Sequence, residues 1–393
     1  MKVYFAPDTS DHPNWGCRVM GAWFPAGLAG AGAPVTFRTG SQWFYRRHPD
    51  MPNLPSLADF RRFAARIGSR KDLSGMAAML EECDLVYLNG ENFIRPGTRK
   101  GRKLLFLAYL AKAVFKKPCV LTNHSVDFSE PELAEIAREV YPLLDEVHFR
   151  EEASAEEGSR YATAGCWRLI PDVAWAIPAA PRSEWGELAF RPGQFSAWPD
   201  SAENFDPRNP YVTVCGSSIM SLKQHKDTDV VPAFIALCRR LNKEVAPVVL
   251  AAPDESDLKI MRKVQAALKL PLLGLHLPVR QAIDVIGNAT VHVGGRWHLG
   301  IFAATGGTPL VALNANNHKV HSLMRQLRMD GPVFDVLRLA DHVDDIVRLA
   351  RAHVESGPAL RANILRRSQE LAAQVDQNME FVRRLAAARG KTA

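Results

Sequence analysis

Residues 289–313 read ATVHVGGRWHLGIFAATGGTPLVAL, and they are expected to form a strand, a helix and a second strand in succession. Its first five residues, 289–293, have the apolar and β-branched character of a short buried strand. Residues 301–307 predict a small-residue helix that stops at two glycines, and residues 308–313 predict a second strand. A strand–helix–strand order is typical of a parallel α/β sheet, so residues 294–300 are expected at the carboxyl end of a strand.

Arg296 and His298 occupy this strand-to-helix turn and place a planar guanidinium two residues from a titratable imidazole. Ligands of open α/β sheets collect outside the carboxyl ends of the strands. The pair therefore predicts an anion site with an acid or a base beside it. The alternative is structural: Arg296 forms an ion pair and His298 caps the helix, and the spacing alone does not separate the two interpretations.

The composition describes a globular protein with more than one core. A chain of 393 residues exceeds one ordinary core, and 47% hydrophobic with 23% charged residues excludes a disordered chain. The net charge of +7 suits an anionic substrate or an anionic membrane surface. Because the basic residues are scattered, we expect no nucleic-acid partner.

No segment of the sequence predicts a leader or a membrane span. The most apolar run, residues 104–115, contains Lys112 and is shorter than the roughly 20 residues that a span needs. The six cysteines form no C-x-x-C pair, which favours reduced thiols over a disulfide framework or a zinc site. We therefore expect a cytoplasmic protein whose only membrane contact would be peripheral, at the inner face.

Predicted strands alternate with predicted helices through the first half of the chain, which indicates a doubly wound parallel sheet. The predicted strands are residues 2–5, 84–88, 118–122, 146–149 and 167–170. Polar residues directly follow strands at 14–16, 89–91, 123–125 and 150–151. The carboxyl ends of parallel strands meet at one edge of a sheet, so this recurrence predicts a ligand-binding edge.

Residues 177–209 are rich in Pro, Gly, Ser and Trp and lack periodicity, which indicates a linker. The predicted domains are an N-terminal α/β domain over 1–176 and a C-terminal α/β domain over 210–393 that ends in helices. Two Rossmann-like doubly wound domains facing each other across a cleft form the GT-B arrangement of sugar-transferring enzymes. This likeness of fold does not by itself fix a function.

Ser217, Ser218 and Lys223 follow the first predicted strand of the second domain, where they could bind phosphate. The alternative is an ordinary turn with a solvated lysine. His318 and His321 have the spacing of two ligands on one helical face, but no third ligand is in view, so we expect no metal site.

Four pieces of the sequence, in chain order, resemble the polysaccharide pyruvyl transferase family. They are Asn14-Trp15-Gly16-Cys17-Arg18, the strand 84–91 that ends in Asn-Gly-Glu, Arg150-Glu151-x-x-Ser154 with Pro171-Asp172, and Arg296-x-His298 with Gly307-x-Pro309. Two positions depart from the family pattern: Cys17 stands where many members carry an acidic residue, and Asn92 stands where Gly is common. Both departures concern the identity of the acceptor more than the chemistry.

The resemblance implies a GT-B-like fold and transfer of a pyruvyl group from phosphoenolpyruvate to a sugar of a bacterial surface polysaccharide or its precursor. The products are a pyruvate ketal and phosphate. Arg296 and His298 inherit the donor site and the catalytic roles, with Ser217, Ser218 and Lys223 as further donor-binding candidates. No cofactor is implied, because phosphoenolpyruvate is the donor substrate. The partners are this donor and a glycan or lipid-linked saccharide acceptor.

The N-terminal domain would bind the acceptor. The candidate acceptor-binding residues are Asn14, Gly16, Asn89, Glu91, Asn123 and His124. Glu91 can act as a base that accepts a proton from a sugar hydroxyl, or it can be a buried structural carboxylate. Asn14 can instead cap a helix, and His124 can be a histidine satisfied within a loop.

Two other functions fit the same pattern. A GT-B glycosyltransferase could hold the pyrophosphate of a nucleotide sugar at the same helix start, although no obvious acidic ribose-binding residue follows 294–300. A non-catalytic binding module could keep the fold, but the presence of both Arg296 and His298 speaks against it.

Overall fold

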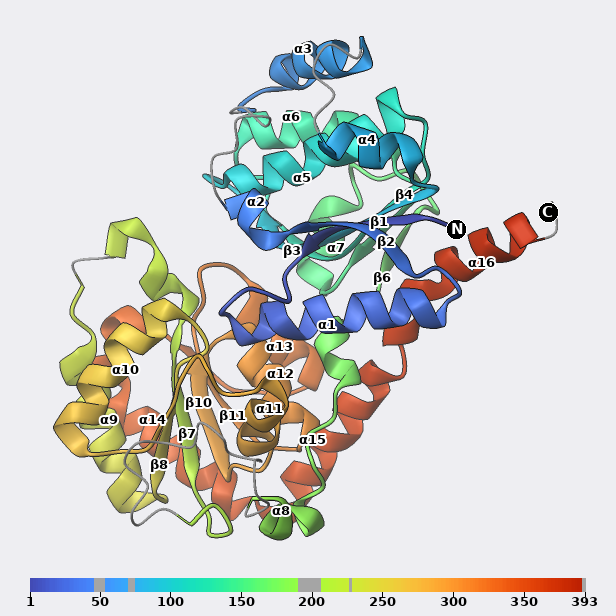
Figure 1. The fold of residues 1–393 in the computed structure, drawn as a ribbon. Helices are drawn as coiled ribbons and strands as arrows, with labels where there is room; N and C mark the ends of the chain where they lie inside the picture. Colours follow the sequence, from blue (N-terminus) through green and yellow to red (C-terminus); the bar gives the residue numbers. More distant parts are fainter. Residues whose placement is uncertain (46–53, 70–74, 190–205, 226–227, 391–393) are drawn as a thin grey trace. The chain divides into compact units, whose positions relative to one another are not determined.

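The computed structural model describes residues 1–45, 54–69, 75–189, 206–225 and 228–390. Contacts divide the chain into two compact units (Figure 1). The first unit consists of Met1–His12, Cys17–Val173 and Gln374–Ala393, and the second consists of Pro13–Gly16 and Ala174–Ala373. Each unit contains one parallel six-stranded sheet, which confirms the predicted α/β fold class.

The first unit is built on a sheet of order β2-β1-β3-β4-β5-β6. Its strands are β1 (Val3–Asp8), β2 (Val35–Gly40), β3 (Leu85–Ile94), β4 (Cys119–Val126), β5 (Glu146–Phe149) and β6 (Trp167–Leu169). Nearly every residue of β1, β3, β4 and β5 is buried, as expected for parallel strands covered on both faces. The chain leaves β1 on one side to form β2 and returns on the other as β3. The carboxyl ends of β1 and β3 are therefore the switch point where such sheets bind ligands.

Helices cover both faces of this sheet. Tyr4 and Val86 contribute to the core beneath α3 (Leu57–Gly68), α4 (Gly75–Glu82), α5 (Arg99–Tyr109) and α6 (Pro131–Val140). On the other face, Phe24 of α1 (Trp15–Gly30) packs against Phe5 and Tyr87. The remaining elements of the unit are α2 (Ser41–Tyr45), the π-helix Leu110–Val114, the short helix Tyr141–Leu143 and α7 (Glu152–Gly158).

The last segment of the chain, predicted to end the second domain, packs in the first unit instead. It contains the short helix Val375–Met379 and α16 (Glu380–Gly390). The hydroxyl group of Tyr87 donates to the carbonyl of Asn378 at 2.7 Å, and Arg384 forms an ion pair with Glu146. These long-range contacts leave no periodic signal in the sequence, so the boundary at 374 could not be predicted.

The second unit repeats the design with a sheet of order β12-β11-β10-β7-β8-β9. Its strands are β7 (Val212–Ser217), β8 (Val248–Ala251), β9 (Leu272–Leu273), β10 (Val291–Gly295), β11 (Leu310–Leu313) and β12 (Val333–Phe334). The strand order runs outward from β7 through β8 to β9 and then restarts on the other side with β10. The carboxyl ends of β7 and β10 form the switch point of this sheet.

Two layers of helices enclose the second sheet. One core joins Val214 and Val293 to Phe234 of α9 (Val231–Glu244), Met261 of α10 (Glu255–Leu268) and Ile346 of α14 (Leu339–Glu355). The other layer contains α11 (Val279–Gly287), α12 (Trp297–Thr305), α13 (Lys319–Leu327) and α15 (Gly357–Ala372). Shorter helices are Val173–Ala176, α8 (Arg182–Leu188), Ser218–Ser221, Lys223–His225 and Val336–Arg338. The helix α8 lies within the predicted linker 177–209, of which residues 190–205 lie outside the described part.

Helix α12 begins four residues earlier than the predicted helix at 301. Arg296 is its N-cap, with an extended backbone, and Gly300 N–H donates to the Arg296 carbonyl at 3.0 Å. At the other end of α12, the Arg361 guanidinium donates to the carbonyls of Gly306 at 2.9 Å and Ala289 at 2.7 Å. Arg361 thus satisfies a carbonyl group just after α12 and links this end of the helix to the residue that precedes β10 by two positions.

None of the described helices combines the length and the apolar character that a membrane crossing requires.

Candidate functional site

The switch point of the second sheet includes the turn between β10 and α12, within residues 289–313. Gly295 of β10 pairs with Ser217 of β7, and a Cβ atom at Gly295 would lie 2.6 Å from the Asn314 carbonyl oxygen. Only glycine therefore lets the ends of these strands approach so closely. Helix α12 follows at once, with no side-chain cap and no acidic residue in its first turn. A helix start of this kind favours negative charge nearby.

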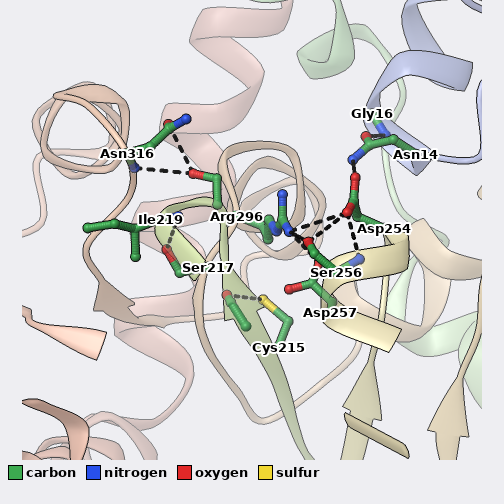
Figure 2. A network of polar contacts seen from close by, with 12 residues as sticks. Asn14, Gly16, Cys215, Ser217, Ile219, Asp254, Ser256, Asp257, Arg296 and Asn316 are labelled. Atoms are coloured by element: carbon green, nitrogen blue, oxygen red, sulfur yellow. Dashed lines mark hydrogen bonds and ion pairs between the residues drawn. The ribbon is translucent and has the colours of Figure 1, made fainter. Parts of the chain in front are cut away.

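The guanidinium group of Arg296 is held by three side chains of α10 and its N-cap (Figure 2). Its Nη2 atom donates to Ser256 Oγ at 2.8 Å and lies 2.8 Å from Asp257 Oδ2 and 3.7 Å from Asp254 Oδ1. Burial works against its charge, but Asp257 and Asp254 outweigh burial and raise the pKa of Arg296. The structural ion pair, one of the two interpretations of Arg296, is thus present.

The Arg296 side chain is nonetheless 11% exposed, and its Nε has no hydrogen-bond partner among the described residues. The ion pair therefore does not cover the side chain completely, although the Nε itself is buried, and an anion-binding role for Arg296 stays a prediction. Asp254 and Asp257 were not predicted as site residues. A signal for them was present in the sequence: they directly follow the apolar run 248–252, as Arg296 follows residues 289–293.

His298 is the second residue of α12, and its ring lies directly against Gly16. A Cβ atom at Gly16 would overlap Nδ1 of His298, so any other residue at 16 would displace the imidazole. Residues 13–16 belong to the second unit, where Trp15 N–H donates to the Pro253 carbonyl at 3.3 Å. The glycine, predicted for its small size beside a ligand, is thus required by the histidine.

Asn14 and Gly16, predicted on the acceptor side, therefore lie beside the residues predicted for the donor. Asn14 Nδ2 donates to Asp254 Oδ2 at 3.4 Å, and its Oδ1 accepts from Gly16 N–H at 3.0 Å. The second contact is the helix cap that was the alternative for Asn14. Residues 13–16 therefore belong to the second unit, although the predicted boundary at 176 places them in the first domain.

Ser217 and Ser218 form the turn that was the alternative to a phosphate site. The Ser217 hydroxyl donates to the Asn314 carbonyl and accepts from Ile219 N–H at 3.3 Å. The Ser218 hydroxyl donates to Asn316 Oδ1 at 3.1 Å. Both residues thus tie the end of β7 to the loop after β11. The side chain of Lys223 lies outside the described part of the structure.

The switch point of the first sheet brings together Asn89 and Glu91, as predicted, and adds Cys17. Glu91 is buried, and its carboxylate accepts from Cys17 Sγ at 3.3 Å and from Asn89 Nδ2 at 3.4 Å. Asn89 Oδ1 is buried with no hydrogen-bond partner among the described residues. Glu91 also has a left-handed backbone with φ 47°. This conformation costs a non-glycine residue roughly 1–2 kcal/mol, and such strain gathers at functional sites.

Asn123 and His124 are used inside the first unit. Asn123 Oδ1 accepts from Val173 N–H at 3.1 Å. His124 Nδ1 lies 2.9 Å from the His148 carbonyl oxygen, and Nε2 lies 3.0 Å from the Tyr141 hydroxyl. Burial lowers the pKa of His124 to about 3, so the ring is neutral. The structure favours the alternative for His124, a satisfied interior histidine, over contact with a sugar hydroxyl.

A fully buried network joins Arg150, Glu151 and Asp172 behind the carboxyl ends of β4, β5 and β6. Arg150 Nη1 donates to Asp172 Oδ2 at 2.8 Å, and its Nε donates to Ser125 Oγ at 3.0 Å. The Ser125 hydroxyl donates to Glu151, which also accepts from Ser154. The Arg-Glu-x-x-Ser and Pro-Asp pieces of the sequence therefore have a structural role, which the sequence alone did not distinguish from a ligand-binding one.

Within the described ranges, no group of three His, Cys, Asp or Glu side chains could hold a metal ion. His318 and His321 thus lack a third ligand there, and the six cysteines are free thiols.

Comparison with known proteins gives a family match over most of the chain. The sequence model of the polysaccharide pyruvyl transferase family matches residues 33–317. Three of the four resembling pieces lie inside this range, and the piece at 14–18 precedes it. A search of curated protein sequences finds no match.

Solved structures share the fold at low sequence identity. The apo structure of OtsA is 10% identical and aligns over 98% of each chain with a TM-score of 0.58. UDP-GlcNAc 2-epimerase from Neisseria meningitidis, bound to UDP-GlcNAc, is 9% identical and aligns over 95% of this chain and 99% of its own with a TM-score of 0.53. TarM is 12% identical with a TM-score of 0.43, and this chain spans only 54% of the length of TarM. These neighbours are GT-B glycosyltransferases and epimerases and show the fold alone.

Proposed function

The chain belongs to the polysaccharide pyruvyl transferase family, and we propose that it transfers a pyruvyl group from phosphoenolpyruvate to a sugar of a bacterial surface polysaccharide or its lipid-linked precursor. The product is a cyclic pyruvate ketal, and phosphate is released. The observation that carries the proposal is the placement of Arg296 and His298 at the uncapped start of α12, on the switch point of the second sheet.

The donor carries a phosphate and a carboxylate, so its site needs cationic and N–H donors. Arg296 offers a guanidinium group on a side chain that is 11% exposed, and the start of α12 adds the positive end of a helix dipole. Helix α12 has neither a side-chain cap nor an acidic residue in its first turn, so an anion there meets no competing carboxylate of the helix. These features favour a compact anionic donor at this edge.

The reaction balances with one acid and one base. A sugar hydroxyl attacks the central carbon of phosphoenolpyruvate while the vinyl carbon gains a proton and becomes a methyl group. A second hydroxyl of the sugar then attacks the same carbon, the bond to the phosphate oxygen breaks, and phosphate leaves with the remaining proton. His298 is the proposed general acid that delivers the proton to the vinyl carbon or assists the departing phosphate.

Glu91 of the first unit is the proposed base or orienting group for the acceptor hydroxyl. Its buried carboxylate is oriented by Asn89 and Cys17, and its left-handed backbone marks a position held under strain. A lipid-linked acceptor would bring the protein to the inner face of the membrane, where its net charge of +7 favours an anionic surface.

Incubation with phosphoenolpyruvate and a panel of bacterial surface glycans tests the activity. Phosphate release together with a pyruvyl mass increase on one glycan is the expected result. The alternative, a glycosyltransferase that uses a nucleotide sugar, is tested by thermal denaturation with UDP, CMP or ADP, because such an enzyme would be stabilised by its nucleotide. Stabilisation by a nucleotide, with none by phosphoenolpyruvate and no phosphate release, would overturn the proposal.

Replacing Gly16 with alanine is expected to lower turnover by about 10- to 100-fold, because the new Cβ atom displaces the His298 ring and misplaced catalytic groups lose rate steeply. Steady-state assay of phosphate release measures the effect. Gly30→Ala is the matched control: it lies at the other end of α1, and a Cβ atom there meets nothing within 4 Å. Equal turnover of the two variants would contradict the contact between Gly16 and His298.

A further inference from the structure

Asp257 has no role in the chemistry above, yet it lies beside the guanidinium proposed to bind the donor (Figure 2). It is in the first turn of α10, and its side chain is 0% exposed. Apart from the ion pair with Arg296, neither of its oxygens accepts a hydrogen bond within the described part of the chain. An ionised carboxylate with so few donors is costly to bury.

The surroundings of Asp257 keep water away from it. A Cβ atom at Gly216 would overlap Asp257 Oδ1, so the carboxyl group lies against the backbone at the end of β7. The titratable groups that face it are Arg296 and Asp254, the N-caps of α12 and α10, and Cys215 of β7. Burial raises the pKa of the Cys215 thiol, which therefore stays neutral. The charge of this cluster is then set by one guanidinium and two carboxyl groups.

With both carboxyl groups ionised, the cluster has a net negative charge and repels an anion. Asp254 is the carboxyl group that keeps its charge: burial opposes ionisation, but Arg296 and hydrogen bonds from Ser256 and Asn14 outweigh burial and lower its pKa. Burial raises the pKa of Asp257 to about 7, with Arg296 opposing the rise and Asp254 adding to it. Asp257 is thus the member of the cluster that changes charge near neutral pH.

We propose that Asp257 is a positioning residue that controls donor binding through Arg296: the anionic donor binds with Asp257 protonated, so binding takes up one proton. The proposal rests on the proposed function, because it takes phosphoenolpyruvate to be the ligand of Arg296. In the donor-free protein at high pH, the carboxylate of Asp257 cancels the guanidinium charge. A phosphate or carboxylate arriving at Arg296 favours the neutral carboxyl group, and the cationic charge is then directed to the donor.

Calorimetric titration of phosphoenolpyruvate into the full chain between about pH 7.5 and pH 9 tests the proposal. The phosphate is fully ionised in this range, since its second pKa is about 6, so a pH slope comes from the protein. The expected dissociation constant rises by up to about tenfold per pH unit. Titrations in two buffers of different ionisation enthalpy should show uptake of close to one proton, a result that needs no variant.

Asp257→Asn keeps the shape of the side chain and removes its charge. Its dissociation constant should be independent of pH and, at pH ~8.5, ~30-fold lower than that of the wild-type protein, because that pH is one and a half units above about 7. Asp254→Asn is the matched control: asparagine also caps helices, and the pH slope should persist because Asp257 still titrates.

The two proposals fail in different ways. A wild-type protein that binds phosphoenolpyruvate without proton uptake, or an Asp257→Asn variant that keeps the wild-type pH slope, would overturn the role of Asp257 and leave the proposed function standing. No binding of phosphoenolpyruvate to the wild-type protein at any pH would overturn the proposed function and the role of Asp257 with it.

Discussion

Turnover of the His298→Ala variant is expected to be lower than that of the wild-type protein by about 10²–10⁴-fold, the usual contribution of a general acid. The imidazole lies at the start of α12, two residues beyond Arg296, on the edge where the second sheet would bind its ligand. Removing it takes away the proposed proton donor but leaves Arg296 and the helix start in place. The affinity for phosphoenolpyruvate should therefore change far less than turnover.

Two additions make the His298 experiment specific. The ring lies against Gly16, so its removal leaves a space beside the glycine, and added imidazole should restore part of the activity. His276→Ala serves as control, because His276 is an exposed residue of the same unit. If the His298→Ala variant kept turnover within about threefold of the wild-type value, far below the loss expected for a general acid, its assignment as the acid would be wrong.

Replacing Arg150 with methionine is expected to lower the free energy of unfolding by about 3–5 kcal/mol, the cost of breaking a buried ion pair on one side. Arg150 is fully buried and donates to Asp172 and Ser125. Without it, the carboxyl groups of Asp172 and Glu151 remain in the interior with fewer donors. The carboxyl ends of β4, β5 and β6 are then no longer joined by the Arg150 side chain, so the first unit should unfold at a lower denaturant concentration.

Arg62→Met is the matched control for this experiment. Arg62 also pairs with an aspartate, Asp59, but its side chain is 64% exposed, so the same substitution should cost under about 1 kcal/mol. Denaturant unfolding followed by circular dichroism measures both variants. Because the chain has two units, the loss should affect the transition of the first unit alone. Equal stability of the two variants would show that the Arg150 network contributes no more than a surface pair.

The sequence predicted the alternation of strands and helices well, because buried parallel strands and amphipathic helices have distinct periods. Strand β5 has the predicted bounds, 146–149. The prediction was poorer at the carboxyl ends of strands. β3 and β4 continue through the polar residues at 89–91 and 123–125 that were expected to follow the strands, and Glu91 pairs with His124.

The positions of the candidate residues were predicted better than their contacts. Arg296 and His298 lie at the predicted strand-to-helix turn of the second unit, whereas Asn89 and Glu91 lie within β3 and not after it. The partners of these residues could not be predicted, since Asp257 and Cys17 are distant in sequence from the groups they contact. Gly16 was predicted for a ligand, whereas its lack of a side chain makes room for His298.

Calorimetric titration of phosphoenolpyruvate into the wild-type protein and the Arg296→Lys variant shows whether Arg296 binds the donor. Lysine keeps the positive charge but lacks the planar fork that suits phosphate and carboxylate groups. We expect saturable one-to-one binding to the wild-type protein and at least about tenfold weaker binding to the variant, about 1.4 kcal/mol. Equal affinities, or binding of UDP, CMP or ADP in place of phosphoenolpyruvate, would contradict the account.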